Sequence, residues 1–243
     1  MISTDQPAVE MELPGLSSSR GLVSTWRTRQ NAGHSISDAG ARRRTVAALH
    51  DFDPVQVAAL EAGAWAAYYR HEWWRFIRLG MACARQSFGL PWRDTVRLSW
   101  LVMRANQHWS PYPDNDAARA LATMERFYAI LADRHGLLLD PAQAARRDLA
   151  WWRIHRELQH GLRSDTAALE AALIAFWQIV YPVPEVDLSA AARDRAVAME
   201  VSDRWIVEGC HPDSPLLERI RRALTDSYAA LHAAVAGTPV LAQ

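Results

Sequence analysis

The chain has 243 residues, a length that suits one main domain able to bury a core of its own. Its 27 Lys+Arg and 27 Asp+Glu residues cancel, so no global field attracts polyanions, and we expect no nucleic-acid partner and no membrane partner. All 27 basic residues are arginine, which excludes chemistry that needs a lysine, including pyridoxal phosphate anchoring, Schiff bases and the phosphate-loop lysine.

The two cysteines, Cys83 and Cys210, are far apart in the sequence and predict neither a disulfide framework nor a thiolate zinc site. The N-terminus lacks a basic start followed by an apolar run, and charges interrupt every apolar stretch well before about 18 residues. We therefore expect a cytoplasmic protein. The arginine and alanine content is typical of a high-GC bacterial genome.

Residues 1–50 carry scattered prolines and glycines, three serines at 17–19 and three arginines at 42–44, with little periodic apolar content. This composition predicts a flexible or disordered N-terminal arm. Residues 51–243 are then predicted to form an all-helical domain, since Val, Ile and Thr almost never alternate with polar residues there.

Helix boundaries follow from capping residues, glycines and prolines. Asp53 and Asp140 are predicted N-caps, each followed by proline at the first helical position and by a Gln three residues after the cap, as in a capping box. The predicted helices cover 54–88, 92–109, 116–135, 141–160, 166–181, 189–208 and 215–235. The sequence thus predicts an all-α single bundle of six to seven helices.

One pattern occurs twice: D-P-x-Q, then an acid, a Trp and a Tyr or His at identical offsets. The two copies are Asp53, Glu61, Trp65, Tyr68 and Asp140, Asp148, Trp152, His155. Two explanations are open. Either the domain consists of two pseudo-duplicated three-helix units plus a terminal helix, or two helix starts have converged on the same capping residues.

Helical phase places several polar side chains within or beside the apolar stripes, at about 100° per residue. They are Glu61, Tyr68, Glu125, Asp148, His155, Glu200 and Asp203. Glu157 and His160, which match the Glu-x-x-His step of ferritin-like metal sites, point away from their stripe and are predicted to be solvated. A buried carboxylate must be paired, protonated or bound to metal.

Four interpretations of the inward acids are open. In a purely structural network, Arg97 and Arg104 would neutralise them. In a metal site, an iron or manganese ion, or a pair of ions, would serve an oxidoreductase that acts on a small apolar or aromatic substrate. Its predicted ligands are Glu61, Glu125, Asp148, His155, Glu200 and Asp203.

In a metal-free enzyme, an isomerase, cyclase or lyase, the catalytic residues would be Glu61, Tyr68, Asp148 and His155. In the fourth interpretation the domain is a non-catalytic helical protein whose tryptophan-rich interior binds a small-molecule ligand or a partner. Non-covalent haem on His155 or His108 is a variant of this interpretation, and no Cys-x-x-Cys-His sequence exists for covalent attachment.

Overall fold

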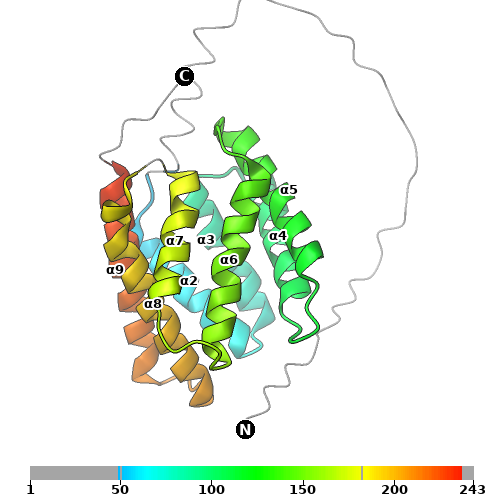
Figure 1. Cartoon of the computed structure of the whole chain (residues 1–243). Coiled ribbons are helices and arrows are strands. Elements are labelled where there is room, and N and C mark those ends of the chain that lie inside the picture. The colour runs from blue at the N-terminus through cyan, green and yellow to red at the C-terminus, as the bar shows by residue number, and fades with distance from the viewer. Residues whose placement is uncertain (1–48, 50, 182, 237–243) are drawn as a thin grey trace, which may run out of the picture.

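The computed structural model describes residues 49, 51–181 and 183–236, and every regular element in this part of the chain is a helix (Figure 1). The elements are α2 Pro54–Tyr69, α3 Trp73–Phe88, α4 Trp92–Trp109, α5 Ala117–His135, α6 Pro141–Gln159, α7 Ala167–Val180, α8 Glu185–Val207 and α9 Pro215–Ala236. The all-α prediction is confirmed, with eight described helices where six to seven were predicted. The predicted arm, apart from Leu49, lies outside the described residues.

The additional helix arises because the first predicted helix is two helices. α2 ends at Tyr69, and His71 adopts a left-handed backbone conformation with φ 58°. The Glu72 amide then donates to the Ala67 carbonyl at 2.8 Å, which closes the end of α2 in the manner of a Schellman motif. Glycine usually occupies such a position, so the histidine gave no sequence signal for a helix end.

The two predicted N-caps form, but neither capping box is complete. The Asp53 carboxylate accepts hydrogen bonds from the Val55 and Gln56 amides at 2.9 and 3.1 Å, and Asp140 accepts one from the Ala142 amide at 2.9 Å. The reciprocal contact of a capping box, from the Gln side chain to the backbone of the cap, is not formed in either helix. The carboxylates therefore cap α2 and α6 without help from the glutamines.

The eight helices form a ring in chain order. Each helix packs against the next one, and α9 packs against α2, so the first and last described helices close the ring. Figure 1 shows the helices standing side by side, with α6 and α7 in front of α2 and α3. The repeated pattern opens α2 and α6, the first and fifth members of this ring. Because of the extra helix, the first copy of the pattern opens a run of four helices, α2 to α5, before the second copy begins. The duplication hypothesis had units of three helices.

Three clusters of buried apolar side chains fill the interior. The most extensive helix pairing among the described residues is that of α8 with α9. Alanines of α8 are buried there, and the Ser227 hydroxyl donates to the Ala191 carbonyl at 2.8 Å. None of the described helices is both long enough and apolar enough to cross a membrane.

Candidate functional site

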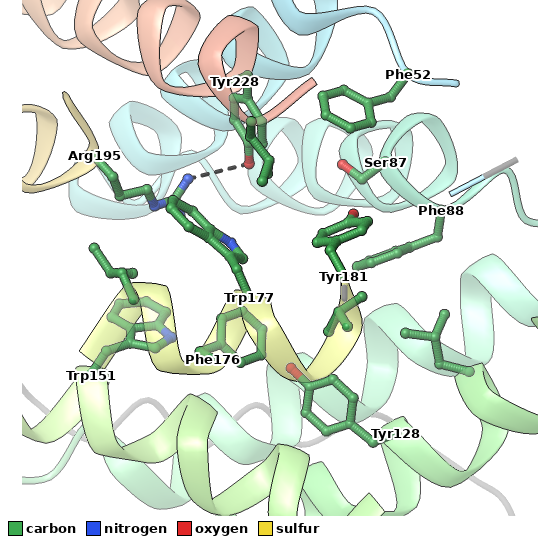
Figure 2. A pocket seen from close by; sticks show the side chains of 14 residues that line it. Phe52, Ser87, Phe88, Tyr128, Trp151, Phe176, Trp177, Tyr181, Arg195 and Tyr228 are labelled. Carbon is green, nitrogen blue, oxygen red and sulfur yellow. Dashed lines mark hydrogen bonds between the residues drawn. The ribbon is translucent and has the colours of Figure 1, made fainter. Parts of the chain in front are cut away.

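A cavity of about 150 Å³ lies among the inward faces of six helices, α3 and α5 to α9 (Figure 2). Most of its lining is apolar or aromatic. The lining residues are Phe52, Ser87, Phe88, Tyr128, Leu131, Trp151, Leu173, Phe176, Trp177, Val180, Tyr181, Arg195, Tyr228 and Leu231. Figure 2 shows Trp177 and Tyr181 of the α7 segment projecting between Tyr228 on one side and Tyr128 on the other.

Beside Tyr228 lies a largely buried ion pair that, together with the Tyr228 hydroxyl, joins three helices. Arg195 of α8 donates two hydrogen bonds to the Glu61 carboxylate of α2, at 2.8 and 2.6 Å. The Tyr228 hydroxyl of α9 donates to the same carboxylate at 2.6 Å and accepts from Arg195 at 3.2 Å. The guanidinium also lies over the Trp65 ring, 5.6 Å from its centroid. We call Glu61, Arg195 and Tyr228 the Glu61 cluster.

Electrostatics hold the charges of this cluster in place. Burial by itself would disfavour the Arg195 cation, but the Glu61 charge and the Tyr228 hydroxyl keep the pKa of Arg195 above its ordinary value. Burial, together with the Glu61 charge, also raises the pKa of Tyr228 well above its ordinary value. Tyr228 therefore stays a neutral phenol at the cavity wall.

A second buried carboxylate lies beside Tyr128. The Tyr128 hydroxyl of α5 donates to one Asp148 oxygen at 2.8 Å, and the Trp151 indole nitrogen donates to the other oxygen at 2.8 Å. Burial raises the pKa of Asp148 to about 6, although these hydrogen bonds act in the opposite direction. No cation bonds to Asp148 among the described residues. We call Asp148, Tyr128 and Trp151 the Asp148 cluster.

The two clusters share a design. In each, a buried acid accepts a hydrogen bond from a tyrosine that lines the cavity. The acids are Glu61 and Asp148, which hold the same position in the two copies of the repeated pattern. The structure thus places both near one cavity, although neither acid lines it.

The other two predicted catalytic residues lie elsewhere. His155 Nε2 is 3.0 Å from an Asp203 carboxylate oxygen, and the Gln159 amide donates to the other oxygen of Asp203 at 2.8 Å. Tyr68 packs among aromatic rings at the end of α2, and burial raises its pKa. Neither Tyr68 nor His155 lines the cavity. The four predicted catalytic residues therefore do not form one site.

The six predicted metal ligands are also spread over the fold. Among the described residues, no group of three or more His, Cys, Asp or Glu side chains is arranged to hold a metal ion. Glu125 is exposed, and Glu200 is exposed on α8 with Arg204 at 3.5 Å. Only His155 and Asp203 of the six form a contact with each other.

Glu200 was predicted to lie within or beside the apolar stripe of its helix, and it is exposed instead. Val207, an apolar residue at the end of α8, is 75% exposed and takes no part in the buried face of that helix. The buried residues of α8 run from Leu188 through Arg195 to Trp205, and most of them are apolar. Glu200 lies next to this buried face but outside it, so its carboxylate is exposed to solvent.

Arg195 and Tyr228 were absent from the sequence predictions. Arg97 and Arg104, which were expected to neutralise the acids, are exposed on α4. The available signal for Arg195 was its spacing: it lies four residues after Ala191 and four before Met199, both fully or nearly fully buried. An arginine within a stripe of buried alanines indicates a buried carboxylate partner.

Comparison of the chain with models of known protein families, with curated proteins and with solved structures found no match in any of the three.

Proposed function

We propose that the protein binds a small, mostly apolar or aromatic molecule that carries one hydrogen-bond donor, in the cavity between the Glu61 and Asp148 clusters. The observation that carries this proposal is a cavity of about 150 Å³ with aromatic walls and a carboxylate-bound tyrosine on each side. An apolar cavity of roughly this volume accommodates a molecule about the size of benzene. The ligand is accordingly a single ring or a short branched chain.

The hydrogen bonds of the tyrosines favour a ligand that donates. The Tyr128 proton is already given to Asp148, and the Tyr228 proton to Glu61. Tyr228 also accepts from Arg195, whereas no described residue donates to the Tyr128 oxygen. A hydroxyl or amine of the ligand can therefore donate to Tyr128, and a phenol or a small alcohol fits better than a hydrocarbon.

The test compares phenol with benzene as probes, using calorimetry or quenching of tryptophan fluorescence. A hydrogen bond to Tyr128 should make phenol bind roughly 2- to 10-fold more tightly than benzene. Tyr128→Phe should remove this preference and leave benzene binding nearly unchanged. Tyr112→Phe is the matched control, because Tyr112 is 49% exposed and does not line the cavity.

A cavity-filling variant supplies an independent test. Leu131→Phe adds volume at the cavity wall and should weaken the binding of both probes. If Leu131→Phe folds and binds both probes as well as the wild type does, the ligand is not in this cavity and the proposal is wrong. Thermal unfolding of each variant shows whether it remains folded.

A second candidate function, a metal-free isomerase, cyclase or lyase, is favoured by one specific observation. Asp148, with a pKa near 6, is joined to the cavity through the Tyr128 hydroxyl. When Asp148 is protonated it can donate to Tyr128, which reverses the hydrogen bond seen in the structure. Tyr128 can then pass its own proton to a substrate atom and take the Asp148 proton, which leaves a neutral tyrosine and an aspartate. Proton removal from another substrate atom would reverse these transfers and complete an isomerisation.

This enzymatic candidate requires exchange of a carbon-bound hydrogen with solvent. Incubation of a bound unsaturated alcohol or cyclic ketone in D₂O should place deuterium in the ligand, and the rate should fall as the pH rises above about 6, where Asp148 loses its proton. Asp148→Asn should abolish the exchange without abolishing binding. Binding without any exchange would leave the protein a ligand-binding module.

A further inference from the structure

The outward faces of α3 and α4 carry tryptophans in contact with solvent. Trp74 of α3 is 87% exposed, and Trp92 and Trp100 of α4 are 55% and 46% exposed. Val96, which is 43% exposed, lies four residues from each of the α4 tryptophans, so the three side chains form one stripe along that helix. A stripe of large apolar side chains on the outside of a helix is typical of an interaction surface.

The same two helices concentrate positive charge. They contain six arginines, all exposed, at positions 75, 78, 85, 93, 97 and 104. Their single carboxylate, Asp94, pairs with Arg134 of α5. Arg75 pairs with Glu72, and the other five arginines have no carboxylate within 4 Å in the described part of the chain. The net charge of the whole chain is zero because acidic residues elsewhere balance this local excess of arginine.

Helical phase puts the arginines and tryptophans on the same sides of their helices. Viewed down the axis of α4, the side chains from Trp92 through Trp100 to Arg97 occupy a sector of about 140°. The buried residues Leu98 and Ala105 lie on the opposite side and face the interior. On α3, Trp74, Arg78 and Arg85 fall within about 40° of one another. We call these outward surfaces of two adjacent helices the α3–α4 face.

We propose that the α3–α4 face docks on an anionic lipid surface. Arginine attracts anionic headgroups, while indole rings and an aliphatic residue such as Val96 insert at the boundary between headgroups and acyl chains. A nucleic acid would use the charge and could stack on the indoles, but it offers no apolar environment for Val96. The attraction is local, since exposed charges are screened beyond about 10 Å at 0.1 M salt.

The experiment uses the purified full-length chain and two sets of vesicles, phosphatidylcholine alone and phosphatidylcholine mixed with phosphatidylglycerol. The protein should sediment with the mixed vesicles, weakly or not at all with phosphatidylcholine alone, and less as salt is added. Its tryptophan emission should shift to shorter wavelength on binding. Arg93→Gln/Arg97→Gln should lower the partition coefficient roughly 30-fold, and Trp92→Ala/Trp100→Ala should reduce the emission shift.

The matched control is Arg219→Gln/Arg222→Gln, which removes the same charge from two exposed arginines on α9. The proposal requires that this control bind as the wild type does. It is overturned if neither set of vesicles binds, or if both arginine double variants lose binding equally. It is also overturned if a single-stranded oligonucleotide binds this face and vesicles do not. A third contrary outcome is that the face joins two copies of this chain, so that Arg93→Gln/Arg97→Gln dissociates a dimer and leaves vesicle binding unchanged. Circular dichroism shows whether each variant is folded. If Arg93→Gln/Arg97→Gln does not fold, the single variant Arg97→Gln takes its place.

Discussion

Glu61 and Asp148 are both buried carboxylates, but they are stabilised in different ways. Glu61 binds the Arg195 guanidinium with two hydrogen bonds, so a full positive charge compensates it. Asp148 receives hydrogen bonds from neutral donors, Tyr128 and Trp151. Neutral donors offset only part of the cost of burying a charge, and the pKa of Asp148 accordingly rises to about 6.

The raised pKa of Asp148 makes stability depend on pH. Between pH 4 and 6 the folded protein holds a proton that the unfolded chain, with a pKa of 3.8 at this residue, has lost. Stability from this group is therefore present at low pH and lost as the pH rises through about 6, by about 3 kcal/mol in total. Urea unfolding of the wild type and of Asp148→Asn at several pH values measures this difference.

In that experiment the wild type should lose stability relative to Asp148→Asn as the pH rises from about 4 to about 7, with no further change above. Other titrating groups cancel in the comparison because both proteins contain them. A difference in stability that does not vary with pH would show that Asp148 keeps an ordinary pKa in the folded protein.

Arg195 should be among the most sensitive positions in the chain. Arg195→Met leaves the buried Glu61 carboxylate without its cation and should cost about 3–5 kcal/mol of unfolding free energy. Glu61→Gln/Arg195→Met should recover part of that loss, because no buried charge remains. Arg221→Met, which breaks an exposed pair with Glu218, should cost less than about 1 kcal/mol in the same urea titration. Equal losses in the two single variants would contradict the role of Arg195.

At the scale of the helices, two glycines with similar surroundings have opposite roles. Gly80 lies in the middle of α3, and Gly161 follows α6 with φ +67°. A Cβ atom added at either position would meet nothing within 4 Å. The backbone conformation is therefore the main difference between them, since only glycine adopts a positive φ without strain.

Gly80→Ala should stabilise the protein by about 1 kcal/mol, because alanine has the higher helix propensity and no contact opposes it. Gly161→Ala should destabilise it by roughly 1–2 kcal/mol, because alanine in the left-handed region is strained. Thermal or urea unfolding of the two variants measures both changes. Changes of the same sign would mean that an effect other than backbone conformation dominates at one of these sites.

At the scale of the whole molecule, contact between α9 and α2 turns a chain of helices into a closed ring. The Glu61 cluster lies at this closure, because its three residues come from α2, α8 and α9. The Asp148 cluster lies within α5 and α6. Separation of α2 from α8 and α9 therefore breaks the ion pair and exposes the cavity wall at Tyr228.

A closed ring predicts that the domain unfolds in one cooperative transition. Helix content followed by circular dichroism and tertiary packing followed by tryptophan fluorescence should give the same urea midpoint, since tryptophans occur from α2 to α8. Two independent units, as a loosely joined duplication would produce, should give two separate transitions. Non-coincident curves would show that the ring does not couple its two halves.

The sequence by itself determined the helices and two of the buried acids. Proline, glycine and aspartate at helix ends act locally, so the bounds of α4, α5 and α6 were predicted to within one residue. Helical phase also identified Glu61 and Asp148 as inward residues. The break at His71 escaped prediction because its cause is a backbone conformation that the residue type does not announce.

Only the tertiary structure decided which residues meet. Arg195 and Tyr228 are 134 and 167 positions from Glu61, and no periodicity within a helix connects them. Likewise, the closure of the ring separates Tyr68 and His155 from the cavity and turns Glu125 and Glu200 toward solvent. Local interactions set the helices, whereas the partners of each buried charge depend on how eight helices pack around a shared interior.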